Sequence, residues 1–369
     1  MISETDVTFI IVPTPSREDG SFSSEYIEKS LFEVSKYLKS KRNFHLFSVV
    51  STISPGTTSE ILIPLVERIS EKKVSRDFGL CYNPTFIALG SVIRDFLNPD
   101  LVLIGESDRA SGEQLENIHR KLVENKPRFA RMSPVSAEIT KISLNSFITM
   151  KISFANTLAE ICESLPGANI DDITKALGAD KRISPHYLKG GLAYGGPCFP
   201  RDNRAFAEFS RRLGVEPELA EATDRTNKHQ IERICKKVRS FTENGFKKAS
   251  VLGLSYKSGT YCLDESASVK IIESLIENGT DLCIWDPIAL PTAKELFGNK
   301  VRYAKDMTDC LLYSSIWIFA TYCEEFESIE PSMIKNNPTI IFDSWRIFES
   351  HPIKNNPKVR YIATGLFNS

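Results

Sequence analysis

The chain has 369 residues, of which 41% are hydrophobic and 25% are charged, and its formal net charge is -1. This length is too great for one ordinary core, so two or three domains are expected. The near-neutral charge excludes an electrostatic argument for a nucleic-acid partner. No apolar run is long enough to cross a membrane, and residues 1–6 lack the basic and then apolar pattern of a signal peptide.

The first third of the chain is predicted to alternate between strands and helices. Four short β-rich runs occupy residues 7–12, 47–52, 79–82 and 101–104. Residues 24–39, between the first two runs, carry apolar side chains at helical spacing. This alternation predicts a parallel sheet, which binds ligands beyond the carboxyl ends of its strands. The loops at those ends comprise residues 13–15, 52–58 and 83–86.

The rest of the chain is predicted to be helical and then α/β again. An apolar stripe without Gly or Pro predicts one long helix over residues 135–163, and residues 170–235 are largely helical around the Gly-rich segment 190–196. Strands are expected at 249–252, 281–285, 315–320 and 339–342, with a helix at 266–277. The predicted fold is α/β, with domains at 1–132, 133–236 and 237–369.

Eight cysteines are scattered along the chain, at positions 81, 162, 198, 235, 262, 283, 310 and 323. None form a CxxC pair, and the five histidines lie far from them, so no metal site is expected. Most of the cysteines are expected to be reduced thiols that are buried as small hydrophobic side chains in a cytoplasmic protein.

Cys198 lies in the run GGPCFPRD, residues 195–202, where glycines permit close approach of a ligand and prolines stiffen the loop. A rigidly held thiol with Asp202 four residues further on suits covalent catalysis on a carbonyl group. The alternative is a buried structural cysteine, because thiol reactivity depends on surroundings that a sequence does not show.

Lys141 and Asn145 lie four residues apart on the predicted long helix, so they share a face and could donate two hydrogen bonds to one oxyanion. The alternative for Lys141 is a solvated surface lysine. Thr52, at the end of a predicted strand, either reaches a ligand or only forms a turn. Arg182 and Arg346 either hold a phosphate in bidentate fashion or are surface arginines.

Many short motifs match one known family in order. They are VPTP at 12–15, ST at 51–52, PGTT at 55–58, NP at 83–84, DFLNPD at 95–100, Lys141 with Asn145, RI at 182–183, YL at 187–188, YGG at 194–196, CFP at 198–200, Asp202, Gly253, YK at 256–257, ES at 265–266, DP at 286–287, and Asp343 with Arg346. From about residue 5 to its end, the chain resembles the UDP-glucose/GDP-mannose dehydrogenase family.

The resemblance implies a Rossmann-like NAD domain, a long central helix that forms a homodimer, and a C-terminal Rossmann-like domain that binds the nucleotide of the sugar. It implies oxidation of a nucleotide sugar at its primary C6 alcohol to a carboxylate, with two NAD as oxidant. Cys198 would attack the intermediate aldehyde and later carry a thioester. Lys141 and Asn145 would stabilise the oxyanion, and Asp202 and Thr52 would hold the water used in proton transfer.

The resemblance also implies contacts with the two ligands. Its substrate-binding residues would be Phe86, Ile87, Tyr187, Gly195 and Arg346. Its cofactor-binding residues would be Pro13, Thr14, Thr52 and Lys257. The motif at residues 12–15 looks slightly more like the family members that oxidise N-acetylated UDP-sugars than those that oxidise glucose derivatives.

The chain departs from the family pattern at two important places. The family begins with a strand, a GxGxxG turn and a helix, whereas no GxGxxG occurs here and the strand at Val7 matches a later strand. A truncated sheet predicts weak NAD binding and an exposed apolar edge strand. Thr85 stands where the family has a Glu that serves in proton transfer and thioester hydrolysis, and a threonine cannot be a base near neutral pH. Leu89 also replaces a family Glu, and Asp264 and Glu218 replace arginines.

Three functions remain open from the sequence. The first is an NAD-dependent nucleotide-sugar dehydrogenase, most consistent with a UDP-sugar, whose missing first unit is supplied by a complementing N-terminal peptide or a longer reading frame. The second is a weak or inactive homologue that binds nucleotide sugars and dimerises. The third is a two-electron oxidoreductase with another substrate. Nucleic acids and membranes are not expected partners.

Overall fold

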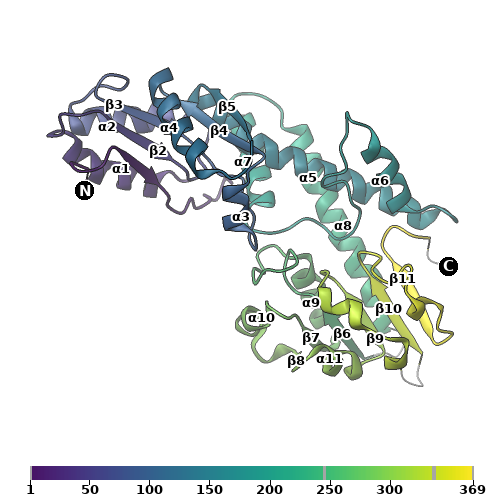
Figure 1. The fold of residues 1–369 in the computed structure, drawn as a ribbon. Coiled ribbons are helices and arrows are strands. Elements are labelled where there is room, and N and C mark those ends of the chain that lie inside the picture. The colour runs from purple at the N-terminus through teal and green to yellow at the C-terminus, as the bar shows by residue number, and fades with distance from the viewer. Residues whose placement is uncertain (1, 244–246, 335–337, 368–369) are drawn as a thin grey trace. The chain divides into compact units, whose positions relative to one another are not determined.

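The computed structural model describes residues 2–243, 247–334 and 338–367. The chain divides into two compact units, which are described separately. Unit 1 comprises residues 1–146 and 201–217, and unit 2 comprises residues 147–200 and 218–369. Two helices contribute residues to both units, α5 (Pro134–Ser164) and α7 (Phe199–Arg212) (Figure 1). The division into three domains stays a prediction. The two units are defined by their internal contacts, and their boundaries differ from those of the predicted domains.

Unit 1 is built on a five-stranded sheet in which the strands follow chain order. Its strands are β1 (Val7–Ile10), β2 (His45–Val49), β3 (Phe78–Tyr82), β4 (Leu101–Glu106) and β5 (Arg128–Met132). Three of the four neighbouring pairs are parallel, as the alternation of strands and helices predicts.

The pairing of β3 with β4 is antiparallel, so the prediction of a wholly parallel sheet is wrong at this pair. Only the last residues of the two strands pair, Cys81 with Glu106 and Tyr82 with Gly105. The helix between these strands, α3 (Val92–Leu97), buries none of its side chains. It therefore does not cover a sheet face as the helix of a parallel crossover does.

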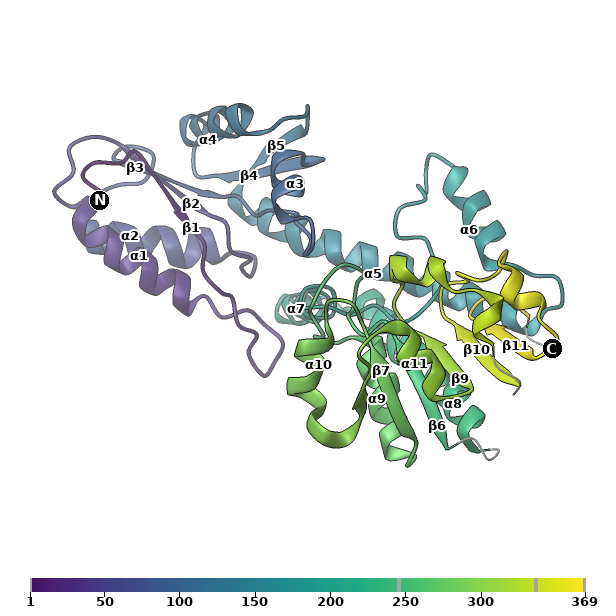
Figure 2. The same ribbon diagram turned by 60° about the horizontal axis from the view of Figure 1, so that its bottom comes forward.

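Apolar faces of three further helices form the core of unit 1. In α1 (Glu25–Leu38) the residues Ile27 and Leu31, one turn apart, are fully buried. The π-helix η1 (Thr58–Leu62) continues into α2 (Ile63–Ser70), and α1 and α2 lie side by side (Figure 2). These helices pack on the inner residues of β2 and β3, while α4 (Arg109–Leu122) buries Leu115 against another part of the sheet.

β1 is an edge strand, since β2 is its only partner among the residues that the structure describes. Phe9 is 40% exposed, and Ile11, just after the strand, is 72% exposed. The prediction of an exposed apolar edge is confirmed. Unpaired edge strands of this kind are templates for pairing with another strand.

Unit 2 contains the second part of α5 and most of the remaining helices. The prediction of one long helix over residues 135–163 is confirmed by the 31 residues of α5. The helices α6 (Ile170–Ala179) and α8 (Glu218–Glu243) also belong to this unit. Within the described residues, no helix is long and apolar enough to span a membrane.

A six-stranded parallel sheet forms the rest of unit 2, in the order β11-β10-β9-β6-β7-β8. Its strands are β6 (Lys248–Leu252), β7 (Asp281–Trp285), β8 (Arg302–Tyr303), β9 (Ile316–Phe319), β10 (Thr339–Asp343) and β11 (Val359–Ala363). Its helices are α9 (Ala267–Glu277), α10 (Leu290–Phe297) and α11 (Met307–Tyr313), and short 3-10 turns η2 to η5 span Gly298–Lys300, Glu324–Ser328, Pro331–Met333 and Pro352–Asn355.

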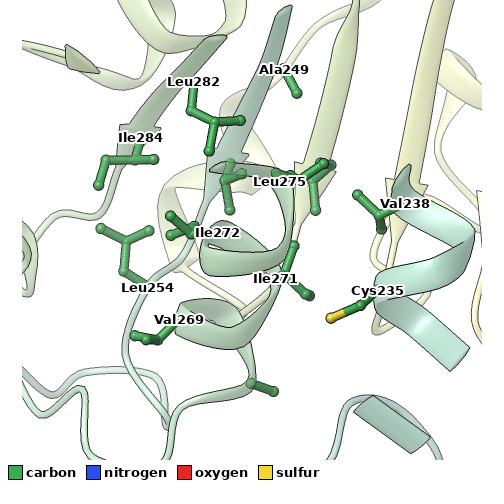
Figure 3. Close-up of a cluster of buried hydrophobic side chains, with 14 of the residues drawn as sticks. Cys235, Val238, Ala249, Leu254, Val269, Ile271, Ile272, Leu275, Leu282 and Ile284 are labelled. Carbon is green, nitrogen blue, oxygen red and sulfur yellow. The ribbon is translucent and has the colours of Figure 1, made fainter. Parts of the chain in front are cut away.

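The largest core of unit 2 lies between its sheet and the helices α8 and α9. Figure 3 shows Cys235 and Val238 of α8 directed toward α9, which carries Ile271 and Leu275. Cys235 thus packs as a small hydrophobic side chain, as expected for most of the cysteines. The packing of α8 on the sheet connects the helical middle of the chain to the last α/β region.

Gly253→Ala is expected to destabilise unit 2 more than Gly279→Ala. Both glycines have a positive φ, 80° and 71°, where an L side chain costs about 1–2 kcal/mol. A Cβ at Gly253 would lie 1.9 Å from the Thr321 carbonyl oxygen, whereas one at Gly279 would meet no atom within 4 Å. The added clash should lower the free energy of unfolding by about 1–3 kcal/mol beyond the matched control, measured by urea denaturation. Equal losses would contradict this account.

Candidate active site

The loops that follow β1 and β2 are joined by a single hydroxyl group. Ser51 Oγ donates to the Val12 carbonyl oxygen at 2.7 Å and accepts from the Val12 N–H at 2.8 Å. This places the predicted ligand residues Pro13 and Thr14 beside the loop that carries Thr52. Pro13 is exposed and Thr52 is half-buried. The Thr14 hydroxyl is buried and has no hydrogen-bond partner among the described residues.

Lys141 lies on the buried face of α5 and contacts the loop after β3. It is 9% exposed, its Nζ donates to the Thr85 carbonyl oxygen at 2.9 Å, and it lies 4.5 Å from the centroid of the Phe86 ring. The alternative of a solvated surface lysine is therefore wrong. Phe86 is half-buried, whereas Ile87 is 42% exposed. The loop is held from its other end by Asn83, whose Nδ2 donates to the Leu103 carbonyl oxygen at 2.8 Å.

Asp202 and Asn145 meet inside unit 1. The Asn145 amide donates to Asp202 Oδ2 at 2.6 Å, and Asp202 is only 1% exposed. The guanidinium of Arg201 donates to Asp202 Oδ1 at 3.2 Å and to the Thr14 carbonyl oxygen at 3.4 Å. Arg201 is a residue that the sequence reasoning missed. The sequence feature that could have identified Arg201 is its position directly beside the acidic residue Asp202 in the cysteine loop.

Glu138 is a second residue that the sequence reasoning missed. It lies one turn before Lys141 on α5 and is fully buried. Its carboxylate accepts from the Gly56 N–H at 2.6 Å and from the Thr58 N–H at 2.9 Å. Burial raises the pKa of this carboxyl group, while these hydrogen bonds favour its charged form. Glu138 therefore fastens the loop that begins at Thr52 to the helix that carries Lys141 and Asn145.

Cys198 is exposed, whereas the other seven cysteines are buried, and none of the eight is in a disulfide. The alternative of a buried structural cysteine is therefore wrong for this residue. Cys198 directly precedes α7, which has Asp202 in its first turn. Helix N-termini are positions at which cysteine thiolates are stabilised in proteins. The thiol is therefore in a suitable place for nucleophilic chemistry.

The two glycines before Cys198 allow a close approach of protein, rather than only of a ligand. A Cβ at Gly195 would lie 2.1 Å from the Glu265 carbonyl oxygen, and a Cβ at Gly196 would lie 2.5 Å from the Tyr256 ring. The Gly196 N–H donates to the Asp264 carbonyl oxygen at 2.9 Å. A neighbouring segment of unit 2 therefore supports the cysteine loop and excludes any larger residue from these positions.

The other predicted residues of unit 2 differ in their accessibility. Tyr187 is 51% exposed with φ at 60°, and its ring packs edge-on against Phe199 at 6.0 Å between centroids. Lys257 is exposed, and its carbonyl oxygen accepts hydrogen bonds within its own turn. Arg182 is a surface arginine, whose side chain is 88% exposed and pairs with Asp180 at 2.6 Å.

Arg346 is 5% exposed, so the alternative of a surface arginine is wrong. Its guanidinium forms a bidentate pair with Asp171 of α6, at 2.6 and 2.9 Å. It also donates to the carbonyl oxygens of Gly190 at 2.8 Å and Thr364 at 2.7 Å. Arg346 thereby ties α6, the chain before the cysteine loop and the end of β11 together. A role in substrate binding stays a prediction.

No group of three or more His, Cys, Asp or Glu side chains suitable for a metal ion occurs in residues 2–243, 247–334 and 338–367. Unit 1 contains a buried ammonium, amide and carboxylate, those of Lys141, Asn145 and Asp202, and unit 2 contains the exposed thiol of Cys198. A thiol can attack a carbonyl carbon, and ammonium and amide groups can stabilise an oxyanion.

Models of three domains of one enzyme family match the chain in order. They are the NAD binding domain at residues 1–123, the central domain at 135–229 and the UDP binding domain at 250–350 of the UDP-glucose/GDP-mannose dehydrogenase family. The UDP-glucose 6-dehydrogenase AglM of Haloferax volcanii is 32% identical over 348 residues, which cover 94% of this chain and 80% of the relative. This chain belongs to the UDP-glucose/GDP-mannose dehydrogenase family.

Other members of the UDP-glucose/GDP-mannose dehydrogenase family support this assignment. A GDP-mannose 6-dehydrogenase of Pseudomonas savastanoi pv. phaseolicola is 35% identical over 287 residues, which cover 77% of this chain and 64% of the relative. The solved structure of a UDP-glucose dehydrogenase from the archaeon Pyrobaculum islandicum is 30% identical, has a TM-score of 0.85, and covers 99% of this chain and 81% of its own. The α/β fold with Rossmann-like sheets is thereby confirmed.

The family matches also sort the predicted site residues. Thr14, Thr52 and Phe86 fall in the NAD binding domain match, and Lys257 and Arg346 in the UDP binding domain match. The central-domain match contains Lys141, Asn145, Tyr187, Cys198 and Asp202. The central-domain match thus contains four of the five residues that are predicted to be catalytic.

Iodoacetamide is expected to alkylate Cys198 well before any other cysteine of the native chain. The physical reason is access, because the other seven thiols are buried. Peptide mapping by mass spectrometry after a short reaction provides the measurement, and Cys198→Ser should remove almost all of the early label. Early labelling of Cys235 or Cys262 at the same rate would contradict the exposure of Cys198.

Proposed function

We propose that this chain oxidises the C6 alcohol of a UDP-sugar to a carboxylate, with Cys198 as the covalent nucleophile. The single observation that carries the proposal is the exposed thiol of Cys198, at the start of a helix that holds the buried carboxylate of Asp202. Membership of the dehydrogenase family supports the reaction class. The relatives are named for two different nucleotide sugars, UDP-glucose and GDP-mannose, so an experiment must identify the sugar.

NAD would supply the hydride acceptor when bound. The buried Thr14 hydroxyl, which has no partner among the described residues, and the adjacent Pro13 and Thr52 fit contacts at the carboxyl ends of β1 and β2. Lys257 is the cofactor contact proposed for unit 2. The 369 residues contain no GxGxxG turn to hold the pyrophosphate. We therefore propose weak NAD binding by this chain, which titration calorimetry with NAD measures directly.

The proposed chemistry uses side chains of this chain at each covalent step. The Cys198 thiolate attacks the carbonyl carbon of the C6 aldehyde and forms a thiohemiacetal. Lys141 and Asn145 donate hydrogen bonds to the oxyanion, a stabilisation that is typically worth about 3–4 kcal/mol per donor. Once the hydride has left, the sugar is held as a thioester on Cys198. Asp202 and Thr52 position the water that releases the acid.

The substrate contacts belong to the same proposal. Phe86, Ile87, Tyr187 and Gly195 would contact the nucleotide sugar, with Arg346 near its nucleotide. Tyr187 and Ile87 are accessible for such contacts, since each is about half exposed. Arg346 would act mainly by holding α6 and the Gly190 carbonyl group in place, because its guanidinium already donates hydrogen bonds to Asp171 of α6 and to this carbonyl oxygen.

A catalytically weak homologue that binds nucleotide sugars and dimerises is the second candidate. Two observations favour it, the absence of a GxGxxG turn from the sequence and the presence of Thr85 in place of a family Glu. A protein of this kind would bind a UDP-sugar in calorimetry yet form no NADH. Steady NADH formation with any UDP- or GDP-sugar would exclude it.

A homodimer through α5 is proposed from an apolar stripe in unit 2. Phe147, Phe154 and Ile161 are spaced by seven residues, so they share one helix face, and each is at least 50% exposed. A groove of about 390 Å³ borders the stripe and is lined mainly by apolar side chains, among them Met150 and Leu188. Light scattering should show a dimer that Phe154→Asp converts to a monomer, while Leu296→Asp, an equally exposed control on α10, leaves it unchanged.

A complementing N-terminal peptide is proposed from the edge of β1. Its apolar side chain Phe9 and the adjacent Ile11 are exposed, and the strand pairs on one side only. A strand–turn–helix peptide with a GxGxxG turn would add to this edge. Mixing the chain with such a peptide should raise the rate of NADH formation. No change in rate, with NAD binding also unchanged, would argue against complementation.

The test of the main proposal is an NADH-formation assay over a panel of UDP- and GDP-sugars. Cys198→Ala should lower the rate of carboxylate formation by about 10³-fold or more, the scale of a lost nucleophile. Cys235→Ala, a buried cysteine in the core of unit 2, should leave the rate within a factor of about two, since the enzyme stays folded. Full activity of the Cys198→Ala variant would contradict the proposed mechanism.

Thr85→Glu should raise the steady rate of turnover by about 10²-fold or more, because a carboxylate can act as the base that the thioester step lacks. The wild-type chain is expected to give one rapid burst of NADH and then a slow phase. Thr85→Gln is the matched control, since it has similar size and no basic carboxylate. Equal rates for the Glu and Gln variants would show that thioester hydrolysis is not limited at this position.

A further inference from the structure

Two segments of unit 2, residues 195–198 and 262–265, contact each other at the cysteine loop. Gly195 packs on the carbonyl group of Glu265, and the Gly196 N–H donates to the carbonyl oxygen of Asp264 at 2.9 Å. The residue number rises along one segment as it falls along the other. Cys198 lies two residues after Gly196, and Cys262 lies two residues before Asp264.

Tyr256 provides a second connection between the same two segments. Its ring lies against Gly196, and its N–H donates to the Cys262 carbonyl oxygen at 3.1 Å. Burial raises the pKa of Tyr256 to about 12, and negative charge at Cys262 and at Cys198 contributes to this shift. Both thiols therefore lie close to one phenol group.

The two thiols also influence each other directly. Burial is the main cause that raises the pKa of Cys262, and negative charge at Cys198 raises it further. Cys262 is 9% exposed, whereas Cys198 is exposed. A soluble oxidant therefore reaches Cys198 first, and Cys262 stays a protected thiol beside it.

We propose that Cys198 and Cys262 form an oxidisable thiol pair, in which a peroxide converts the nucleophile to a reversible disulfide. The hydrogen bonds from Gly196 to Asp264 and from Tyr256 to Cys262 hold the two segments that carry these cysteines against each other, and a disulfide needs Cα atoms about 4.4–6.8 Å apart. The effect on activity rests on the proposed function of Cys198. The formation of the disulfide does not depend on that function.

The chemistry takes place in two balanced steps. The Cys198 thiol reacts with hydrogen peroxide to give a sulfenic acid and one water. The sulfur of Cys262 then attacks the sulfenic sulfur, a second water leaves, and the disulfide forms. In total the two thiols lose two electrons and two protons, and the peroxide is reduced to two waters. An added dithiol reverses the reaction by exchange.

The pair Cys283 and Cys310 is a less suitable target, although these thiols also lie close together. The Cys310 thiol contacts the Cys283 carbonyl oxygen at 3.5 Å. Both residues are fully buried in a core cluster of unit 2. An oxidant in solution would therefore meet Cys198 long before it reached this pair.

The test is a disulfide map of the purified full chain after treatment with an equimolar amount of hydrogen peroxide. Free thiols are alkylated, the chain is digested without reductant, and peptides are identified by mass spectrometry. We expect one cross-linked peptide that joins Cys198 to Cys262, approaching one per chain, and its loss after addition of dithiothreitol. Oxidised Cys198 together with alkylated Cys262 would overturn the proposal, as would a disulfide between other cysteines.

Two variants sharpen the result. Cys262→Ser should abolish the cross-link and leave Cys198 as a sulfenic or sulfinic acid, and Cys262→Ala repeats the test if the serine variant folds poorly. Cys235→Ser is the matched control, since Cys235 is also 9% exposed but lies on α8 in another part of unit 2, and it should keep the cross-link. A cross-link to Cys198 that persists in Cys262→Ser would refute the pair.

Activity gives an independent measurement. If the chain oxidises nucleotide sugars, peroxide should inactivate it, and dithiothreitol should restore most of the wild-type rate but little of the Cys262→Ser rate after prolonged exposure. Equal recovery of the two proteins would oppose a protective role for Cys262. If the chain shows no such activity, the peptide map still decides whether the thiol pair exists, so the two proposals fail separately.

Discussion

The hydrogen bond from the Asn145 amide to the buried Asp202 carboxylate is the contact on which the arrangement of unit 1 depends. It joins α5 to the first turn of α7, and α7 begins immediately after Cys198. Arg201 balances the buried charge and extends the contact to the Thr14 carbonyl group. A buried carboxylate without these donors would be strongly destabilising. The contact therefore fixes the first turn of α7, which follows Cys198 in the chain.

Other buried charged groups have a similar positioning role. Glu138 accepts hydrogen bonds from two backbone N–H groups at the start of η1, and Arg346 donates hydrogen bonds to Asp171 and to two carbonyl oxygens in unit 2. Glu138 holds a loop against the helix that carries Lys141 and Asn145, and Arg346 holds α6 against the chain before the cysteine loop. Buried polar groups with satisfied hydrogen bonds restrict a structure to one arrangement, which a catalytic site requires. The family chemistry of this chain is thus supported by charges that do not themselves react.

The segment opposite the cysteine loop has features of its own in this chain. It carries Asp264, and Cys262 lies two residues before Asp264. The backbone of this segment accepts the Gly196 N–H, so its position relative to the loop does not require a particular side chain at 264. Side-chain identity in this segment can therefore change the chemistry near Cys198 without a change of fold.

Much of the fold followed from local patterns in the sequence. The apolar stripe over residues 135–163 predicted α5, and short β-rich runs predicted eight of the eleven strands found in the described residues, because both depend on side-chain periodicity. The sequence did not reveal β5, β8 or β11. Charged residues interrupt β5 and β11, and β8 has only two residues, so no apolar run marks them. The antiparallel pair β3–β4 also depends on how α3 fails to pack, which is not a local property.

Part of the candidate site could likewise be predicted from the sequence, and part could not. The spacing of Lys141 and Asn145 and the motif around Cys198 predict the candidate reactive groups from the sequence alone. Only the tertiary structure showed that Lys141 contacts Phe86, that Arg201 and Glu138 hold the surrounding loops, and that Arg346 is buried in an ion pair. These facts depend on burial and on contacts between residues distant in the chain. The sequence specifies which chemical groups are present and how they are spaced. The free energy of packing decides which of these groups are exposed to solvent and which are buried in hydrogen bonds or ion pairs.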